Sequence, residues 1–298
     1  MAIPTLPLWI DGKKVPSASG RSGDVFDPSS GQVVRRAPFA SREEVAAAVA
    51  AARAALPGWR DTPPLRRARI LARLRELLES NRDELARLIS EEHGKTVPDA
   101  AGSLQRGIEV IEFATGVPHL LKGELAEDVG RGIDSHSVLQ PVGVCAGITP
   151  FNFPAMVPMW MFPVAIACGN TFVLKPSEKV PSTALRLAEL LKEAGLPDGV
   201  FNVITGSGST VGMALVRHPG VDKIAFTGST EVGKQIMREA AASLKRVSLE
   251  LGGKSPNIVF ADADLERAAA TAPYGVFDNA GQDCCARSRI LVQRSVHD

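Results

Sequence analysis

The sequence lacks the features that mark several classes of protein. Its 298 residues carry a net charge of +1, so no basic surface indicates a nucleic acid or an anionic membrane as partner. Its four cysteines form no framework of pairs, which favours a reducing, cytoplasmic compartment, and we assign no metal ligand. The first ten residues show no basic segment followed by an apolar one, so we expect no signal peptide. Internal repeats and low-complexity segments are also absent from the sequence.

Charged residues are missing from one long stretch, residues 139–174. An apolar segment of about 20 residues could in principle cross a membrane. However, five prolines interrupt this one, at Pro141, Pro150, Pro154, Pro158 and Pro163. Proline removes a backbone donor and breaks a helix, and an unsatisfied backbone is costly in lipid. We therefore expect a buried strand, a loop and a buried helix here.

The first hundred residues predict hairpin strands followed by helices. Residues 8–40 alternate short apolar runs with turn residues, as strands of hairpins do. Ser41 and Glu44 have capping-box spacing and open an alanine-rich helix to about Leu56. Helices are also predicted from Pro63 and from residues 80–83, the last ending near Gly94.

From Thr171 onward, strand and helix patterns alternate. Strands are predicted at 171–175, 200–205, 223–227 and 246–251, and the intervening helices at 182–194, 210–217 and 231–242. Such a series predicts an α/β fold, a Rossmann-like parallel sheet with helices on both faces. A further strand at 257–260 and a helix from Asp264 begin a second α/β domain. We place the domains at 1–251 and 252–298.

Two of the strand-to-helix turns are rich in glycine. They are Gly206-Ser-Gly-Ser-Thr-Val-Gly212 and Gly228-Ser-Thr-Glu-Val-Gly233. Amides at a helix start can hold a phosphate, and a parallel sheet binds its ligands beyond the carboxyl ends of its strands. Either turn alone could be a plain connection, but two in succession favour a dinucleotide.

A tight loop near the C-terminal end carries a candidate nucleophile. The run Gly281-Gln-Asp-Cys284-Cys285 puts a cysteine just after a glycine that allows close approach of a ligand. Cys145 and Cys168 lie among apolar residues, where an inert buried thiol is the ordinary interpretation. Cys285 adjoins Cys284, and such a pair could oxidise. We expect Cys284 to be the reactive thiol.

Four motifs in order resemble the aldehyde dehydrogenase superfamily, from about residue 8 to the last residue. They are Pro150-Phe-Asn-Phe-Pro154, Phe226-Thr-Gly-Ser229, Leu249-Glu-Leu-Gly-Gly-Lys254 and the loop 277–285. The resemblance makes Cys284 the nucleophile, and Asn152 an oxyanion donor together with the backbone N–H of Cys284. It makes Glu250 the general base. We expect Glu250 to be buried at a strand end with a raised pKa, the alternative being a salt bridge with Lys254.

The resemblance also implies NAD as the cofactor. The cofactor contacts that it assigns come from Phe151, Lys175, Ser177, Glu178, Gly208, Gly228 and Ser229. Lys175 and Glu178 would meet ribose hydroxyls, and an acidic group there opposes a 2′-phosphate, which favours NAD over NADP. The alternative for Lys175 is a solvated strand end.

Two subfamilies of the superfamily are represented. The runs Ile133-Asp-Ser-His-Ser137, Pro158-Met-Trp-Met-Phe-Pro163 and Gly169-Asn-Thr171 make the first two hundred residues similar to methylmalonate-semialdehyde dehydrogenases. That resemblance implies transfer of the acyl group to coenzyme A, whereas Glu250 is typical of hydrolytic members. Arg106 matches an arginine of the semialdehyde subfamily that meets a substrate carboxylate; a surface helix arginine is the alternative. Family members are homo-oligomers and extend beyond the cysteine loop. We expect this chain to lack that part, so a nucleotide-binding fragment without turnover is a further hypothesis.

Overall fold

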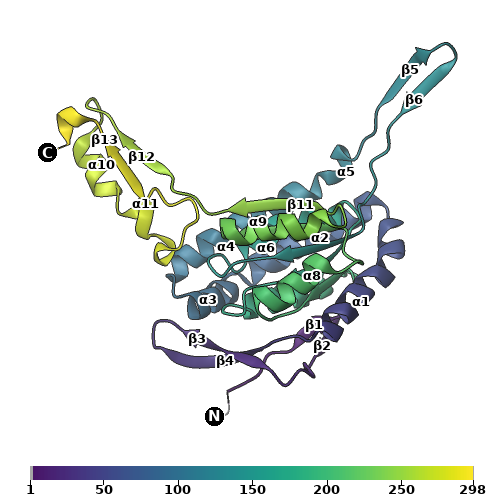
Figure 1. Cartoon of the computed structure of the whole chain (residues 1–298), viewed down its shortest axis with the longest axis horizontal. Coiled ribbons are helices and arrows are strands. Elements are labelled where there is room, and N and C mark those ends of the chain that lie inside the picture. The colour runs from purple at the N-terminus through teal and green to yellow at the C-terminus, as the bar shows by residue number, and fades with distance from the viewer. Residues whose placement is uncertain (1–2, 298) are drawn as a thin grey trace.

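A computed structural model of the chain describes residues 3–297 (Figure 1). Its centre is a seven-stranded sheet with the strand order β11-β10-β7-β8-β9-β1-β2. These strands are β1 (Leu8–Ile10), β2 (Lys13–Val15), β7 (Val144–Ile148), β8 (Thr171–Lys175), β9 (Phe201–Val203), β10 (Lys223–Gly228) and β11 (Arg246–Leu251). The strands β7 to β11 run parallel, and β1 and β2 add an antiparallel edge. The predicted α/β sheet is confirmed.

Helices cover both faces of this sheet, as predicted. One face carries a core shared by α2 (Pro64–Ser80), α3 (Arg82–His93), α4 (Val97–Thr115), α5 (Val117–Leu120), α6 (Met156–Ala167) and α7 (Ser182–Glu193), of which α6 and α7 pack most closely on the strands. The other packs against α1 (Arg42–Arg60), the π-helix η1 (Gly208–Gly212), α8 (Met213–Arg217) and α9 (Thr230–Ala241). Alternate residues of β8 reach the two cores, Phe172 and Leu174 one and Val173 the other. A parallel strand buried on both faces is apolar throughout for this reason.

The first helix begins at a local capping motif and is extended by tertiary packing. Ser41 and Glu44 form the predicted capping box, with Glu44 N–H donating to Ser41 Oγ and Ser41 N–H to Glu44 Oε2. The helix does not end at Leu56 but continues one turn to Arg60, through Pro57. Trp59 is buried and its Nε1 donates to Ile166 O at 3.1 Å. Tertiary packing of Trp59 thus holds a turn that the proline weakens.

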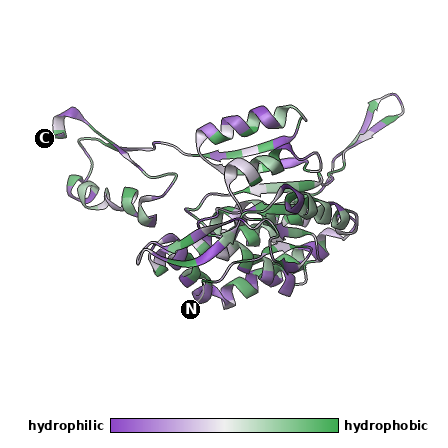
Figure 2. Ribbon diagram, turned by 60° about the horizontal axis from the view of Figure 1, so that its bottom comes forward, coloured by the Kyte–Doolittle hydropathy of each residue, from purple (hydrophilic) through white to green (hydrophobic). Residues whose placement is uncertain are grey.

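Three parts project from the layered body (Figure 1). The hairpin of β3 (Ser22–Asp27) and β4 (Gln32–Pro38) lies near the N-terminus, and that of β5 (Leu125–Gly130) and β6 (Ile133–His136) forms a long arm. The third follows β11 and contains β12 (Pro256–Val259), α10 (Leu265–Thr271), α11 (Tyr274–Phe277), the 3-10 turns η2 (Asn279–Gly281) and η3 (Arg294–Val296), and β13 (Arg289–Val292). Figure 2 shows the arm and this last part on opposite sides of the body.

The residues after Leu251 form a small unit of their own. Strands β12 and β13 pair in parallel as a separate two-stranded sheet, and the strand and helix predicted at 257–260 and from Asp264 are present as β12 and α10. The boundary at residue 252 stays a prediction about how the chain divides into domains.

The uncharged stretch 139–174 contains β7, the loop 149–155, α6 and all of β8 except its last residue, Lys175. This is the division into strand, loop and helix that the prolines predicted. In the part of the chain that the structure describes, no helix has the length and apolar character needed to cross a membrane.

Candidate functional site

The carboxyl ends of the parallel strands gather the predicted motifs at one edge of the sheet. The chain passes from β7 to β8 and β9 on one side, and then returns to place β10 and β11 on the other side of β7. The strand order therefore reverses between β7 and β10. Ligands of open α/β sheets bind at such a switch point. The loop 149–155 follows β7, and the turn at Gly228 follows β10.

Lys175 ends β8 with its side chain buried, 3% exposed. Its Nζ lies 3.1 Å from Glu178 Oε2. Burial lowers the pKa of Lys175, and the Glu178 carboxylate opposes that shift. Ser177, between them, is also buried, and its Oγ accepts from the N–H of Lys179. Lys175 is therefore not the solvated strand end of the alternative interpretation.

Both glycine turns open helices whose first amides are capped by serine. Ser229 Oγ accepts from the N–H of Val232 at the start of α9, and Ser207 Oγ accepts from Thr210 N–H. The helix predicted at 210–217 is divided, because a π-helical turn from Gly208 precedes α8. At Gly228 a Cβ atom would lie 2.4 Å from the Phe226 ring, so a larger residue there would displace that ring.

Asn152 lies where the loop after β7 meets the loop that carries Cys284. Its Nδ2 donates to Gln282 O at 2.7 Å, across 130 residues of sequence. Asn279 Nδ2 donates to the backbone oxygens of both Asn152 and Gln282, at 3.2 Å each. The Oδ1 atoms of Asn152 and Asn279 are buried without a recorded partner among the described residues. The structure thus brings Asn152 beside the loop of Cys284, but its amide is engaged by that loop.

Sequence reasoning missed the side chains that support this meeting point. Lys95 is 2% exposed, its Nζ donates to Asn152 O at 3.0 Å, and it lies 4.3 Å from the centre of the Phe153 ring. Burial lowers the pKa of Lys95 to about 8. Asp99 Oδ2 accepts from the N–H of Asn279 at 2.9 Å. The only signal in the sequence is the lysine that follows Gly94. It does not reveal the site, because the partners that a buried cation needs cannot be identified from the sequence alone.

His93 is a second residue that the sequence did not indicate. It is buried, and its ring stacks on Phe151 with the ring centres 6.2 Å apart. Burial, together with the nearby Lys95 charge, lowers the pKa of His93 to about 4. His93 is therefore neutral at physiological pH and supports Phe151, a predicted cofactor contact, from below.

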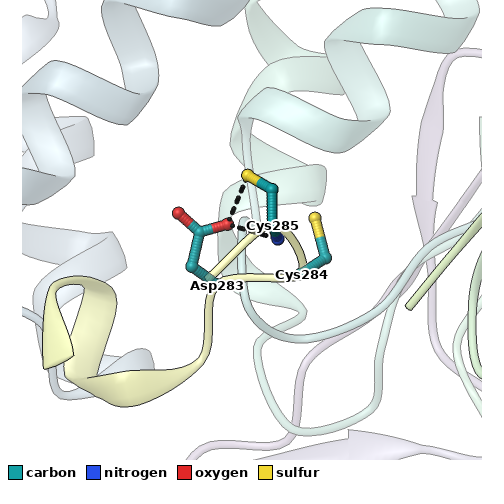
Figure 3. Close-up of side chains that lie close together, drawn as sticks. All are labelled: Asp283, Cys284 and Cys285. Atoms are coloured by element: carbon teal, nitrogen blue, oxygen red, sulfur yellow. Dashed lines mark hydrogen bonds between the residues drawn. The ribbon is translucent and has the colours of Figure 1, made fainter. Parts of the chain in front are cut away.

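The four cysteines differ in their surroundings. Cys145 is buried and burial raises its pKa to about 12; Cys168 is half-buried and its pKa is also raised by burial. Cys284 is half-buried and Cys285 exposed, on adjacent positions of a turn (Figure 3). The thiol of Cys285 donates to Asp283 Oδ1 at 3.0 Å, and this bond, with burial and the Asp283 charge, raises the Cys285 pKa to about 11.

The expectation of a buried Glu250 is wrong. Glu250 is exposed, because β11 is the edge strand of the sheet and its residues alternate between exposed and half-buried. It lines a groove of about 900 Å³ between β10, β11 and α6, whose recorded lining includes Trp160 and Thr227 but not Cys284. No ion pair between Glu250 and Lys254 is recorded within residues 3–297. A Cβ on Gly253 would lie 4.0 Å from Cys284 O, so the chain just beyond Glu250 does reach the loop.

Arg106 lies on the exposed side of α4, on the wall beside Asn152. Its Nε lies 3.2 Å from Met156 Sδ, and its guanidinium lies 5.6 Å from the centre of the Phe153 ring. Lys95 and Arg106 therefore both face the Phe153 ring, near the loop that carries Cys284. This position is compatible with both interpretations, a substrate contact and a surface helix arginine.

The strand order and the loops at its switch point define a doubly wound α/β protein. A sequence profile described as the aldehyde dehydrogenase family matches residues 14–298, and the chain belongs to that family.

The chain is similar to curated semialdehyde dehydrogenases. It is 49% identical over 284 residues to malonate-semialdehyde dehydrogenase of Pseudomonas aeruginosa, covering 95% of this chain and 57% of that protein. It is 48% identical over 296 residues to malonate-semialdehyde dehydrogenase 2 of Geobacillus kaustophilus, covering 99% of this chain and 61% of that protein. This chain therefore spans about 60% of the length of these relatives.

Solved structures of the family share the fold. Methylmalonate-semialdehyde dehydrogenase from Oceanimonas doudoroffii is 49% identical with a TM-score of 0.95, over 98% of this chain and 59% of that one. An aldehyde dehydrogenase from Bacillus cereus, solved as its NAD+ complex, is 38% identical with a TM-score of 0.93, over 98% of this chain and 60% of that one.

Proposed function

We propose that this chain is the cofactor-binding and nucleophile-bearing part of an NAD-dependent aldehyde dehydrogenase. It would oxidise an aldehyde to a carboxylic acid through a thiohemiacetal and a thioester on Cys284. The observation that supports this most is the hydrogen bond from Asn152 Nδ2 to Gln282 O. It brings the proposed oxyanion donor to the loop of the proposed nucleophile, from the end of β7 at the switch point.

The residues at the switch point fit NAD. The buried Lys175 and the half-buried Glu178 offer a cation and a carboxylate, the combination that suits ribose hydroxyls. Ser177 lies between these two residues, and the Phe151 ring lies 5.2 Å from Lys179 Nζ, one residue beyond Glu178. The turns at Gly208, Gly228 and Ser229 present helix-start amides toward which a pyrophosphate can be oriented. NAD, when bound, supplies the acceptor for the hydride that leaves the substrate carbon.

A residue of this chain can then act in each chemical step. Cys284, as the thiolate, forms a bond to the aldehyde carbon. The resulting oxyanion accepts hydrogen bonds from the Cys284 backbone N–H and from Asn152 Nδ2, which exchanges Gln282 O for the substrate. Loss of hydride leaves a thioester. Glu250 removes a proton from the water that hydrolyses it, and because Glu250 is exposed on β11 here, this step requires it to turn toward Cys284.

A second candidate is an acylating semialdehyde dehydrogenase that passes the thioester to coenzyme A. The names of the similar proteins favour it, including a relative in Dictyostelium discoideum described as probable and acylating, 45% identical over 284 residues. Arg106 supports it as well, since its guanidinium beside Phe153 could pair with the carboxylate of a malonate or methylmalonate semialdehyde. Homo-oligomer formation and a cytoplasmic location remain proposals.

A pair of measurements tests these proposals. The first is NAD affinity of the parent, of Lys175→Ala and of the control Lys234→Ala, which changes an exposed lysine on α9. We expect about tenfold weaker binding in Lys175→Ala alone, the size of one lost charged hydrogen bond. Equal affinity in all three proteins would contradict the ribose assignment.

The second measurement is NADH formation from propanal and from malonate semialdehyde, with and without coenzyme A. Turnover without coenzyme A supports hydrolysis, and Glu250→Gln should then give a single burst and stop at the thioester. A strict requirement for coenzyme A supports the acylating candidate. NAD binding without any NADH would assign a nucleotide-binding role to this chain.

A further inference from the structure

The turn that carries Cys284 brings three metal-ligand side chains together. One oxygen of Asp283 and the Sγ atoms of Cys284 and Cys285 all lie within 4.8 Å of one another (Figure 3). Consecutive side chains of an extended strand point in opposite directions, so this convergence depends on the turn. A hydrogen bond from Ala286 N–H to Asp283 O, 3.2 Å long, closes it. The N–H of Cys285 donates to Asp283 Oδ1 at 3.1 Å, which fixes the carboxylate on the side of the thiols.

We propose that Asp283, Cys284 and Cys285 form a binding site for a soft divalent cation such as Zn²⁺, which would block the thiol of Cys284. Two sulfurs and one carboxylate oxygen give three protein ligands, and Zn²⁺ in four-coordinate sites accepts such sets with water in the fourth position. Thiolates select soft or borderline cations over Mg²⁺ and Ca²⁺. Binding replaces the two thiol protons by two metal–sulfur bonds and releases the protons to solvent.

The surroundings are compatible with the charge of this complex. Two thiolates and a carboxylate carry three negative charges, so a divalent cation leaves a net charge of −1. The buried ammonium group of Lys95 interacts electrostatically with Asp283 and offsets that charge. The half-buried Cys284 and exposed Cys285 leave an open path for the ion, whereas Cys145 lies in the core.

Cobalt binding to the 298-residue chain tests the site directly. Co²⁺ bound to thiolates absorbs in the near ultraviolet, and tetrahedral coordination gives intense visible bands. We expect one Co²⁺ per chain, displaced by Zn²⁺. Cys285→Ser and Asp283→Asn should each weaken Zn²⁺ binding by about tenfold or more, since each removes a ligand. The matched control is Cys145→Ala with Cys168→Ala, which should bind as the parent does.

Alkylation mapping gives the second measurement. Zn²⁺ should slow iodoacetamide labelling of Cys284 and Cys285 and leave Cys168 unchanged. No thiolate–cobalt absorption in the parent, or an unchanged spectrum in Cys285→Ser and Asp283→Asn, would overturn the proposal. NAD affinity measured on the same samples separates the two ideas. Intact NAD binding without a metal spectrum rejects only the metal site, and a metal spectrum without NAD binding rejects only the proposed cofactor role.

Discussion

The sheet and the unit after Leu251 are held together in different ways. In β7 and β8 every residue is buried, and helices press on both faces. In residues 252–298, by contrast, α10 and α11 contain no buried residue, and large side chains such as Tyr274 and Phe277 are exposed. Recorded hydrogen bonds of Asn152, Asn279 and Asp99 fasten its loop to the body. The scaffold is thus stabilised by apolar burial, and the position of the Cys284 loop by a few polar contacts.

The largest expected effect on stability comes from a substitution in the core beside the sheet. Leu71, on α2, is fully buried in the core of one face. Leu71→Ala should lower the free energy of unfolding by about 2–5 kcal/mol, because it removes apolar contacts and leaves a cavity. Phe277→Ala, at a site 71% exposed in the last unit, should change it by about 0.5 kcal/mol or less. Urea unfolding followed by circular dichroism compares them, and equal losses would contradict the comparison.

The next effect depends on pH and concerns Glu92 at the end of α3. Burial raises the pKa of Glu92 to about 7, although Ser182 and Arg35 donate to its carboxylate. The folded pKa lies above that of the unfolded chain, so the neutral form is favoured by folding. The resulting stability is present below about pH 4.5 and is lost as the pH rises toward 7, by about 3 kcal/mol in total.

Glu92→Gln provides the measurement, because glutamine does not titrate. The difference in unfolding free energy between the parent and Glu92→Gln should decrease between pH 4.5 and 7 and then level off. His93 titrates in both proteins, so its contribution cancels in that difference. A difference that does not change with pH would show that Glu92 is ionised throughout, held so by Arg35 and Ser182.

A smaller, local effect is expected where the loop that carries Cys284 is attached to the body. Lys95→Met keeps the apolar stem and removes the ammonium group that donates to Asn152 O. Hydrogen exchange in the peptide 279–285 should become about tenfold faster, as expected for the loss of a charged hydrogen bond. Lys95→Arg keeps a donor and should restore part of the protection. Faster exchange throughout the sheet as well would instead mean that Lys95 supports the scaffold.

The smallest effect tests a purely local interaction. Ser41→Ala removes the side-chain half of the capping box of α1 and should cost about 1 kcal/mol of unfolding free energy. Ser243→Ala, at an exposed position after α9, is the control and should be neutral. Thermal unfolding measures both. A loss near zero for Ser41→Ala would show that packing alone positions this helix.

The sequence by itself determined the elements whose causes are local. The capping box at Ser41, the glycine end of α3 at Gly94 and the βα alternation after Thr171 follow from propensity and apolar pattern, and all are present. The family motifs located Cys284 and Asn152 without any structure, and their roles remain predictions.

Only the tertiary structure decided the features that depend on distant partners. Glu250 is exposed because it lies on an edge strand of the sheet. Helix α1 continues past Pro57 because Trp59 is buried. The tertiary structure also placed Lys95 against Asn152 and Asp99 against Asn279. Burial and electrostatic environment depend on which segments become neighbours in space. The contacts of Lys95 with Asn152 and of Asp99 with Asn279 join residues 57 and 180 positions apart. Contacts at such separations produce no periodic pattern in a sequence.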